Sequence, residues 1–364
     1  MRIWQCPGPA RLLAELTDAL VDGRSAILRI PCLAPEGLEQ ELATVMGADG
    51  WRMGRIEDTG SNPARQVIEA AWVENALASE VTATTLTERA ELAGRVFWCV
   101  PQDATGVERW LAFLDAYAVA CRARPEADGP RFVLSLLGTL ACPAPPKKIG
   151  IEVLDVGGAA NQTDLLLLAY HQTGTTFGAS LKAQVIAQTA ASIALWDLAL
   201  LNRLLDETPE RLFAPASVLQ CYAAEQGWEK ATPPSWQSGT RRELGTNEEV
   251  HSALLVLNDT KGVIPSRVWA GQAAVLLPAI ERRRLELIEE HKDLLARHIP
   301  FKTDYETVSD VYSLQIGAVW YLLKNNANSH TQSRTLRLKK ARDSLAHMTP
   351  LSPDDAFGSA VTGE

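Results

Sequence analysis

The residues best suited to chemistry stand near the end of the chain, where Arg342 and Asp343 are followed by His347. Cleavage of RNA by its own 2′-hydroxyl group needs one side chain that moves protons and one cation that holds the charged phosphate. Histidine can do the first and arginine the second. Asp343 precedes His347 by four residues, so on a helix its carboxylate shares a face with the ring and can orient it. These residue types at this spacing are therefore suited to acid–base chemistry on a phosphate ester without a metal.

The end of this helix is set by Pro350, which disfavours helical geometry at the residue before it. We expect the helix to end near Met348, with His347 in its last turn. Arg342 lies about 140° around an ideal helix from His347, an angle that suits a site shared by two subunits. The alternative is structural. His347 would cap the helix end, Arg342 would pair with a neighbouring glutamate, and a stripe of apolar side chains would face the core. That stripe consists of Leu338, Ala341, Leu345 and Met348.

Four further cations precede this pattern, namely Arg334, Arg337, Lys339 and Lys340. The run stands out because the whole chain is acidic, with a net charge of −9 and a pI near 5.3. A basic helix can follow the phosphate backbone of a nucleic acid, so the run predicts RNA contact. The alternative is a solvated helix face, because the helix dipole already favours cations towards the C-terminus.

Periodic apolar residues predict helices over residues 267–297, 310–323 and 331–348. The pattern Arg342-Asp343-x-x-x-His347 at the end of the last helix resembles the Arg-polar-x-x-x-His signature of HEPN domains. The resemblance covers about residues 264–352. It implies a small helical bundle, and in that family such bundles often act as ribonucleases and form dimers.

Ahead of these helices, short apolar runs alternate with helical patterns. The runs predict strands over residues 25–31, 51–56, 95–100, 131–137 and 149–156. The patterns predict helices over residues 36–45, 63–78, 107–122, 164–171, 179–205 and 217–226, with a loop over 228–245. Because strands that alternate with helices need crossover connections, we expect an α/β N-terminal domain with a mainly parallel sheet of about five strands. An all-α C-terminal half should follow it.

Several catalytic motifs are missing from the sequence. A P-loop needs a glycine-rich turn followed by lysine, but no Gly-Lys dipeptide occurs, and the turn after the first strand holds Pro31 and Pro35. The patterns Gly-x-Gly-x-x-Gly, Gly-x-Ser-x-Gly and His-Glu-x-x-His are also absent. No two cysteines stand at metal-ligand spacing, and Asp103 is a lone carboxylate after its strand. We therefore expect no hydrolysis of ATP or GTP, no cofactor and no metal.

The order of elements over residues 1 to about 225 resembles a degenerate AAA+ or STAND-type NTPase module. The resemblance implies the fold of that family without its ATP hydrolysis, because the family's motif residues have no counterpart here. We expect an NTPase-like domain at 1–157, a helical lid-like region with a junction at 158–262, the HEPN-like domain at 263–352 and a flexible tail at 353–364.

Trp228 and Trp236 flank a Pro-Pro pair, and Trp269 begins a strongly apolar helix. Aromatic side chains favour interfaces, so we expect partner binding or self-association through them, with local packing of the loop as the alternative. The sequence thus indicates a non-hydrolysing adaptor or regulator in a bacterial multi-protein system, such as those of anti-phage defence. The alternatives are a HEPN-type ribonuclease and a nucleotide sensor without a P-loop. No apolar run has the length of a signal or membrane segment, so we expect a cytoplasmic protein.

Overall fold

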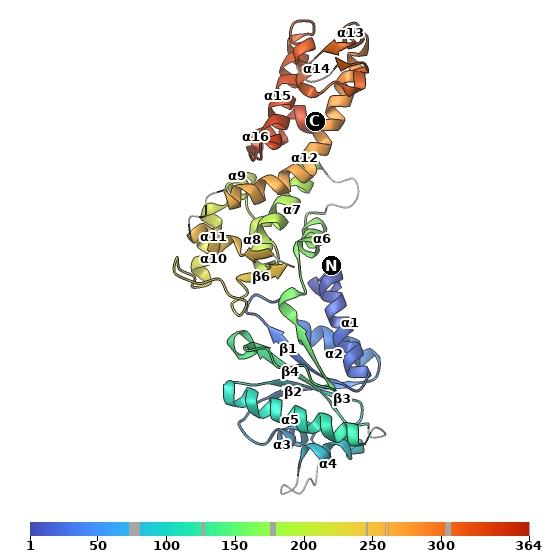
Figure 1. The fold of residues 1–364 in the computed structure, drawn as a ribbon, viewed down its shortest axis with the longest axis vertical. Helices are drawn as coiled ribbons and strands as arrows, with labels where there is room; N and C mark the ends of the chain where they lie inside the picture. The colour runs from blue at the N-terminus through green and yellow to red at the C-terminus, as the bar shows by residue number, and fades with distance from the viewer. Residues whose placement is uncertain are drawn as a thin grey trace. The chain divides into compact units, whose positions relative to one another are not determined.

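The computed structural model describes residues 1–72, 81–124, 128–174, 180–244, 247–258, 260, 262–302 and 307–363. The chain forms two compact units (Figure 1). Unit 1 consists of Met1–Asp164 and Pro233–His251, and unit 2 consists of Leu165–Thr232 and Ser252–Glu364. The segment from Pro233 to His251 therefore returns to unit 1 after the chain has built the first helices of unit 2.

Unit 1 contains a five-stranded sheet with the order β2-β3-β4-β1-β5. Every pair of neighbouring strands is parallel. The strands are β1 (Ser25–Ile30), β2 (Arg52–Glu57), β3 (Arg95–Val100), β4 (Arg131–Leu137) and β5 (Ile151–Asp155). The prediction of a mainly parallel sheet of about five strands is confirmed, because each predicted apolar run forms a strand.

Helices cover both faces of this sheet. They are α1 (Pro7–Val21), α2 (Leu38–Ala48), α3 (Pro63–Ala70), α4 (Ala83–Thr87) and α5 (Ala104–Ala123). Helix α1 packs on β1 and α2 on β2, whereas α5 packs on β4 and β5 beside α3 and α4. The core between α5 and the sheet is aromatic: Phe132 meets the ring edges of Phe113 and Tyr117 at centroid distances of 5.2 and 4.9 Å. Residues 73–78 of the predicted helix over 63–78 lie outside the described residues.

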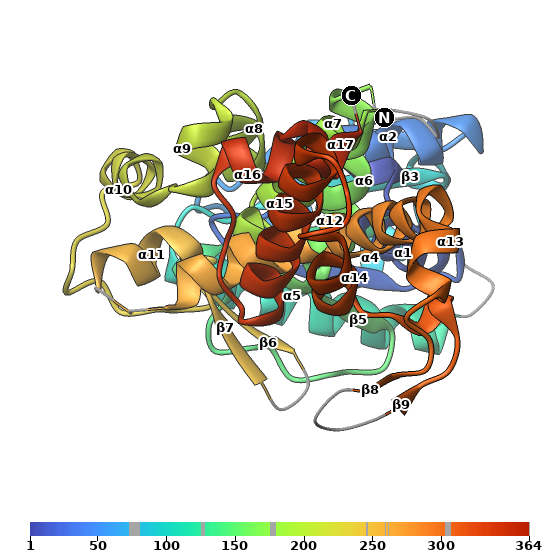
Figure 2. The ribbon, with the colours of Figure 1, turned by 90° about the horizontal axis from the view of Figure 1, so that it is seen from above.

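Unit 2 is helical apart from one short hairpin among its described residues, so the prediction that helices dominate the C-terminal half is confirmed. The helices are α6 (Gln162–Gln172), α7 (Leu181–Ala194), α8 (Leu198–Leu205), α9 (Pro209–Phe213), α10 (Ala216–Glu225), α11 (Ser252–Leu257), α12 (Val263–Glu290), α13 (Lys292–Ala296), α14 (Ile316–Leu323), α15 (Ser329–Ala346), α16 (Pro353–Phe357) and α17 (Ser359–Thr362). The hairpin pairs β8 (Phe301–Lys302) with β9 (Thr307–Val308). Figure 2 shows α15 beside α12 and α14, which it contacts.

The predicted helix over residues 179–205 is two helices in the structure, with residue 179 outside the described residues. Leu195 has a positive φ of 61°, which ends α7. The Asp197 carboxylate then accepts hydrogen bonds from the backbone of Ala199 and Leu200 and starts α8. Part of the predicted loop over 228–245 forms β6 (Arg241–Leu244), which pairs with β7 (Asn247–Val250); residue 245 lies outside the described residues.

The expected flexible tail at 353–364 is folded as far as the structure describes it. Residues 353–357 and 359–362 form α16 and α17, and the side chains of Ala356, Ala360 and Val361 are buried. The apolar residues of the tail pack into the core of unit 2, which explains the correction. Pro353 is the first residue of α16, where its missing N–H costs nothing.

Helix α12 is the core helix of unit 2. Of the described helices, it is the one long and apolar enough to cross a membrane by length and composition. Leu276, Ile280 and Leu287 are nonetheless fully buried inside the unit, and α12 packs along α7. Part of the apolar surface on which we based self-association is thus used within unit 2, and self-association stays a prediction.

Helix α1 was not predicted, although Pro7 at the start of a helix is a recognised signal. Its first turn is held by Asp164, whose residue is 1% exposed. The Asp164 carboxylate accepts hydrogen bonds from the backbone N–H of Gly8 and of Asn161, both at 3.0 Å. A carboxylate is favoured at this end of a helix by the helix dipole. Gly8 must be glycine, because a Cβ atom there would lie 2.1 Å from the carbonyl oxygen of Ala159.

We expect Asp164→Ala to destabilise unit 1, because the buried Gly8 N–H and the part-buried Asn161 N–H would lose their acceptor. The expected cost is about 1–3 kcal/mol for each group left unpaired. Urea unfolding of the full chain measures it. Asp18→Ala, at an exposed carboxylate of the same helix, is the control and should change stability by less than about 0.5 kcal/mol. Equal effects of the two substitutions would contradict this role of Asp164.

Candidate functional site

The predicted ribonuclease residues lie at the end of α15, as expected from Pro350. The helix ends at Ala346, and His347 is its C-cap. The Thr349 N–H donates to the Ser344 carbonyl at 2.9 Å, and the Met348 N–H donates to the Leu345 carbonyl at 3.2 Å. This is the Schellman arrangement, which requires a left-handed residue after the cap, and Met348 supplies it with φ 57°.

Helix α12 holds this turn in place. The Trp269 indole N–H donates to the Leu345 carbonyl at 2.7 Å, which satisfies a carbonyl at the helix end. The buried Gln272 amide binds the backbone of Leu351 in both directions: its Nε2 donates to the carbonyl at 3.0 Å, and its Oε1 accepts from the N–H at 2.7 Å. Helix α12 therefore fixes the chain both before His347, at Leu345, and after it, at Leu351. Trp269, predicted to bind a partner, makes its polar contact inside unit 2.

The three predicted side chains differ in their contacts. The His347 residue is exposed, and the Arg342 side chain is 40% exposed. The Asp343 carboxylate accepts a hydrogen bond from Lys339 Nζ at 2.6 Å and lies 3.5 Å from Arg342 Nη1. Its contacts are thus with two cations and not with the ring that we expected it to orient. The structure brings Arg342 and Asp343 together and leaves His347 open to solvent at the helix end.

The four predicted phosphate-binding cations do not form one stripe. Arg334 pairs with Glu290 at 2.9 Å and lies 3.8 Å from Glu286, in a cleft that Arg337 also lines. Lys339 points towards α14, where its Nζ lies 5.9 Å from the centre of the Trp320 ring. The residues Arg337 and Lys340 are exposed. Carboxylates therefore compensate Arg334 and Lys339, whereas Arg337 and Lys340 face solvent.

A second region of interest is the carboxyl end of β1, where open parallel sheets bind their ligands. Residues 233–240, which we call the returning loop, cover it. The Cys32 N–H donates to the Gln237 carbonyl at 2.9 Å. Gly239 approaches Leu33 so closely that a Cβ atom would lie 2.7 Å from the Leu33 Cβ. The returning loop holds its own shape through hydrogen bonds among Ser235, Ser238 and Thr240.

Trp236 is the side chain of the returning loop that fills this position. Its ring stacks on Arg29, with the guanidinium carbon 4.3 Å from the ring centre. The same guanidinium donates to the Ala141 carbonyl at 3.1 Å and to Asp155 at 3.3 Å. Trp236 thus packs locally in unit 1, the alternative that the sequence had left open. Trp228 is half-buried, with its ring edge against Tyr222 at 6.1 Å.

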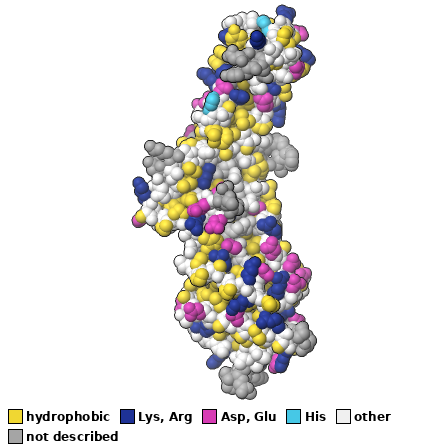
Figure 3. Space-filling model, in the orientation of Figure 1, with side chains coloured by type: hydrophobic (Ala, Val, Ile, Leu, Met, Phe, Trp, Pro, Cys, Tyr) yellow, Lys and Arg dark blue, Asp and Glu magenta, His cyan; other side chains and the backbone are white. Residues whose placement is uncertain are grey.

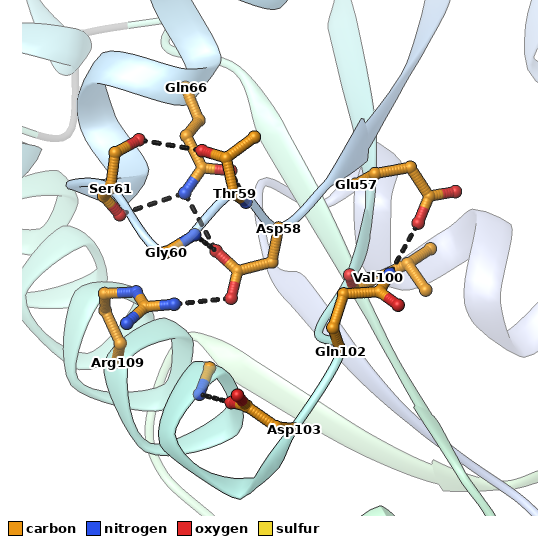
Figure 4. Close-up of polar contacts among 11 residues, drawn as sticks. Glu57, Asp58, Thr59, Gly60, Ser61, Gln66, Val100, Gln102, Asp103 and Arg109 are labelled. Atoms are coloured by element: carbon orange, nitrogen blue, oxygen red, sulfur yellow. Dashed lines mark hydrogen bonds and ion pairs between the residues drawn. The ribbon is translucent and has the colours of Figure 1, made fainter.

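A third polar group gathers at the carboxyl ends of β2 and β3, and sequence reasoning did not find it (Figure 4). Asp58 follows β2, and its side chain is 3% exposed. The carboxylate accepts hydrogen bonds from Gln66 Nε2 at 2.9 Å, from the Gly60 N–H at 3.2 Å and from the Arg109 guanidinium of α5. Asp58 and Arg109 are 51 residues apart in the sequence, and they come together only because β2 lies beside β3 in the sheet and α5 follows β3 in the chain.

The remaining carboxylates at this edge also have structural partners. Asp103 caps α5, since its side chain accepts from the Gly106 N–H at 2.7 Å. Glu57 accepts from Gln102 Nε2 at 2.8 Å (Figure 4). Within the described ranges no three His, Cys, Asp or Glu side chains are grouped so that they could hold a metal ion. The arrangement joins β2, β3 and α5 and offers no set of ligands for a cation.

Burial raises the pKa of Asp58, but the hydrogen bonds from Gln66, Gly60 and Arg109 outweigh it, so its pKa lies below the ordinary value. A carboxyl group with a lowered pKa stabilises the folded state at pH values above the unfolded pKa, near 3.9. That stabilisation is lost as the pH falls through the folded pKa.

Comparison with known proteins gives little. No protein-family model matches the chain, and no curated protein matches it. A solved structure of Drosophila ORC bound to AT-rich DNA and Cdc6 is 10% identical over 98% of this chain and 71% of that one, with a TM-score of 0.25. The structure of Drosophila ORC bound to GC-rich DNA and Cdc6 is 12% identical over 93% of this chain and 67% of that one, with a TM-score of 0.24. So weak a structural similarity carries no argument, and the HEPN resemblance stays a prediction.

We expect Met348→Gly to stabilise the full chain by about 0.5–1 kcal/mol. A left-handed conformation costs a residue with a Cβ atom about 1–2 kcal/mol, and the greater freedom of unfolded glycine offsets part of the gain. Because Met348 is 56% exposed, little packing is lost. Thermal and urea unfolding measure the change. Met348→Ala is the control and should give no such gain; an equal gain from alanine would rule out backbone strain as the cause.

We expect Asp58→Asn to lower the stability of the full chain by about 1–3 kcal/mol at pH 7, because the amide has one acceptor oxygen and cannot accept from Arg109 on one side and from Gln66 and Gly60 on the other. The gap between wild type and variant should narrow as the pH falls below about 3.9. Urea unfolding at pH 7 and at pH 3.5 tests both statements. The control is Asp128→Asn, whose side chain is 66% exposed. A gap that stays constant with pH would refute the role of the ionised carboxylate.

Proposed function

We propose that this chain is a non-hydrolysing adaptor or regulatory component of a multi-protein assembly and that it acts through protein–protein contacts. The observation that carries the proposal is the returning loop on the carboxyl end of β1, with Trp236 stacked on Arg29. A phosphate-binding loop at that edge needs free backbone N–H groups. Pro31 and Pro35 have none, and the N–H of Cys32 is bound to Gln237.

The setting we propose is a bacterial multi-gene system of the anti-phage type. Its support is the pair of resemblances in the sequence, a degenerate NTPase-like module followed by HEPN-like helices, because such pairs are common in those systems. In this proposal unit 1 is a structural module without nucleotide turnover, and unit 2 supplies surfaces for a partner. The partner would carry the catalytic activity.

A second candidate function is a metal-independent ribonuclease with a site built from two copies of the chain. It is favoured by the exposed His347 and by the part-exposed Arg342 on a helix end that α12 holds rigidly. Pre-positioned groups are what acid–base catalysis requires. The engagement of Asp343 by Lys339 counts against a ring-orienting role for that carboxylate.

One experiment separates the two functions. The full chain is co-expressed with the products of adjacent genes, and complexes are identified by size-exclusion chromatography with light scattering. An adaptor should form a complex of fixed stoichiometry without nucleotide, and Arg342→Ala and His347→Ala should leave it intact. The purified complex should release no phosphate from ATP or GTP.

The same preparations are incubated, free of metal, with labelled single-stranded and transfer RNA. RNA cleavage by the wild type that is lost in His347→Ala, with an unchanged melting temperature, would replace the adaptor with the ribonuclease. Phosphate release that co-elutes with the protein, or a failure to bind any product of the adjacent genes, would reject the adaptor.

A further inference from the structure

One surface of unit 2 combines an exposed tyrosine and a half-buried tryptophan with two lysines, of which sequence reasoning singled out Lys339 alone. We call it the α14–α15 surface, formed by Trp320, Tyr321 and Lys324 of α14 with Lys339 of α15. Lys324 Nζ lies 4.2 Å from the centre of the Tyr321 ring and 5.4 Å from that of Trp320. Lys339 Nζ lies 5.9 Å from Trp320 on its other flank. Tyr321 is 55% exposed, so its ring is available to a ligand.

The charge of this segment is opposite to that of the whole chain. Residues 316–347 contain six lysines and arginines and one carboxylate, a formal charge of +5 in a chain whose net charge is −9. In Figure 3 basic side chains lie beside hydrophobic ones over the end of unit 2 that α13, α14 and α15 form. Such a local excess of cations favours a polyanionic ligand over a neutral one.

A second tyrosine–lysine pair in unit 2 differs from this one because a glutamate neutralises the charge of its lysine. Lys292 Nζ lies 5.1 Å from the Tyr312 ring. The Tyr312 hydroxyl donates to Glu289 at 2.5 Å, and Lys292 lies 3.7 Å from the same glutamate. Within the described part of the chain, Lys324 by contrast contacts two rings and no carboxylate. Its charge is therefore left for a ligand.

We propose that the α14–α15 surface binds single-stranded nucleic acid. Unpaired bases stack on aromatic rings, and lysines beside the rings attract the phosphates that join the bases. Tyr321 would receive a base on its exposed ring, and Lys324, which contacts no carboxylate among the described residues, would hold the flanking phosphate. Lys340, which is exposed, is a further cation on α15. This inference does not depend on the adaptor function or on cleavage at His347.

The chemistry favours a single strand over other polyanions. A duplex hides the faces of its bases, so it would use the lysines and leave the Tyr321 ring without a stacking partner. An acidic protein surface or an anionic membrane would likewise satisfy the charges alone. Stacking on Tyr321 is thus the feature that distinguishes the proposed ligand, and the test is built on it.

The test is fluorescence anisotropy of the full chain with labelled 15-nucleotide strands, oligo-U and oligo-dT, and with a duplex of equal length. Single strands should bind, and the affinity should fall as salt rises. Tyr321→Ala should weaken binding by about fivefold or more, the effect of losing one stacked base. Lys324→Gln should weaken binding and reduce the salt dependence by about one ion. The two strands decide whether RNA or DNA is preferred.

Tyr312→Ala is the matched control, an exposed tyrosine beside a lysine on a surface that glutamate compensates, and it should leave binding unchanged. Thermal melts confirm that each variant is folded. Absence of binding to both strands at low salt would overturn the proposal. So would equal losses in Tyr321→Ala and Tyr312→Ala, or binding to the duplex or to phosphatidylserine vesicles as tight as to the single strands. None of these results would affect complex formation with a partner, so the adaptor proposal is judged separately.

Discussion

The arrangement of unit 1 depends on how the guanidinium of Arg29 is satisfied at the carboxyl end of β1. A charged group with a side chain only 19% exposed needs several partners, because unpaired burial of charge is costly. The Ala141 carbonyl, Asp155 and the ring of Trp236 provide them. Two of these partners follow neighbouring strands, and the third comes from a segment about 200 residues further along the chain. The edge that would receive a ligand in an open parallel sheet is therefore filled by the protein itself.

In unit 2 the equivalent constraint is the attachment of the end of α15 to α12. Trp269 and Gln272 satisfy backbone groups of Leu345 and Leu351 that would otherwise be left unpaired at a helix end. The strained Met348 is kept in its left-handed conformation by this attachment. Rigid placement of His347 is compatible with catalysis, yet it is equally what a well-packed helix end requires. We therefore propose the adaptor before the ribonuclease, whose proposed site would need a second copy of the chain.

Charge is distributed so that two surfaces of α15 differ in what they can do. On one side, Glu286 and Glu290 compensate Arg334, and on the other, Lys339 lies between Asp343 and the Trp320 ring. A basic run that looks uniform in the sequence is thus divided by the turn of the helix. The cations beside the aromatic residues of α14 are Lys339 and Lys324, and Lys324 comes from α14 itself. Binding of a polyanion is therefore best sought at α14 and α15 together.

The sequence by itself determined the elements whose signals are local. Alternating apolar runs and helical patterns gave the five strands and most helices, because side-chain periodicity follows directly from backbone geometry. Pro350 was enough to place the end of α15. Helix α1 was missed because its first turn is stabilised by Asp164, more than 150 residues away, and the folded tail was missed because its short apolar stretches are buried only by packing on other helices, among them α9, α12 and α15. Only the tertiary structure decided which side chains meet: Trp236 with Arg29, Asp58 with Arg109, and Lys339 with Asp343. The last of these pairs interrupts the run of cations that the sequence suggested. These contacts depend on the order of strands and the packing of distant helices, which no local pattern encodes.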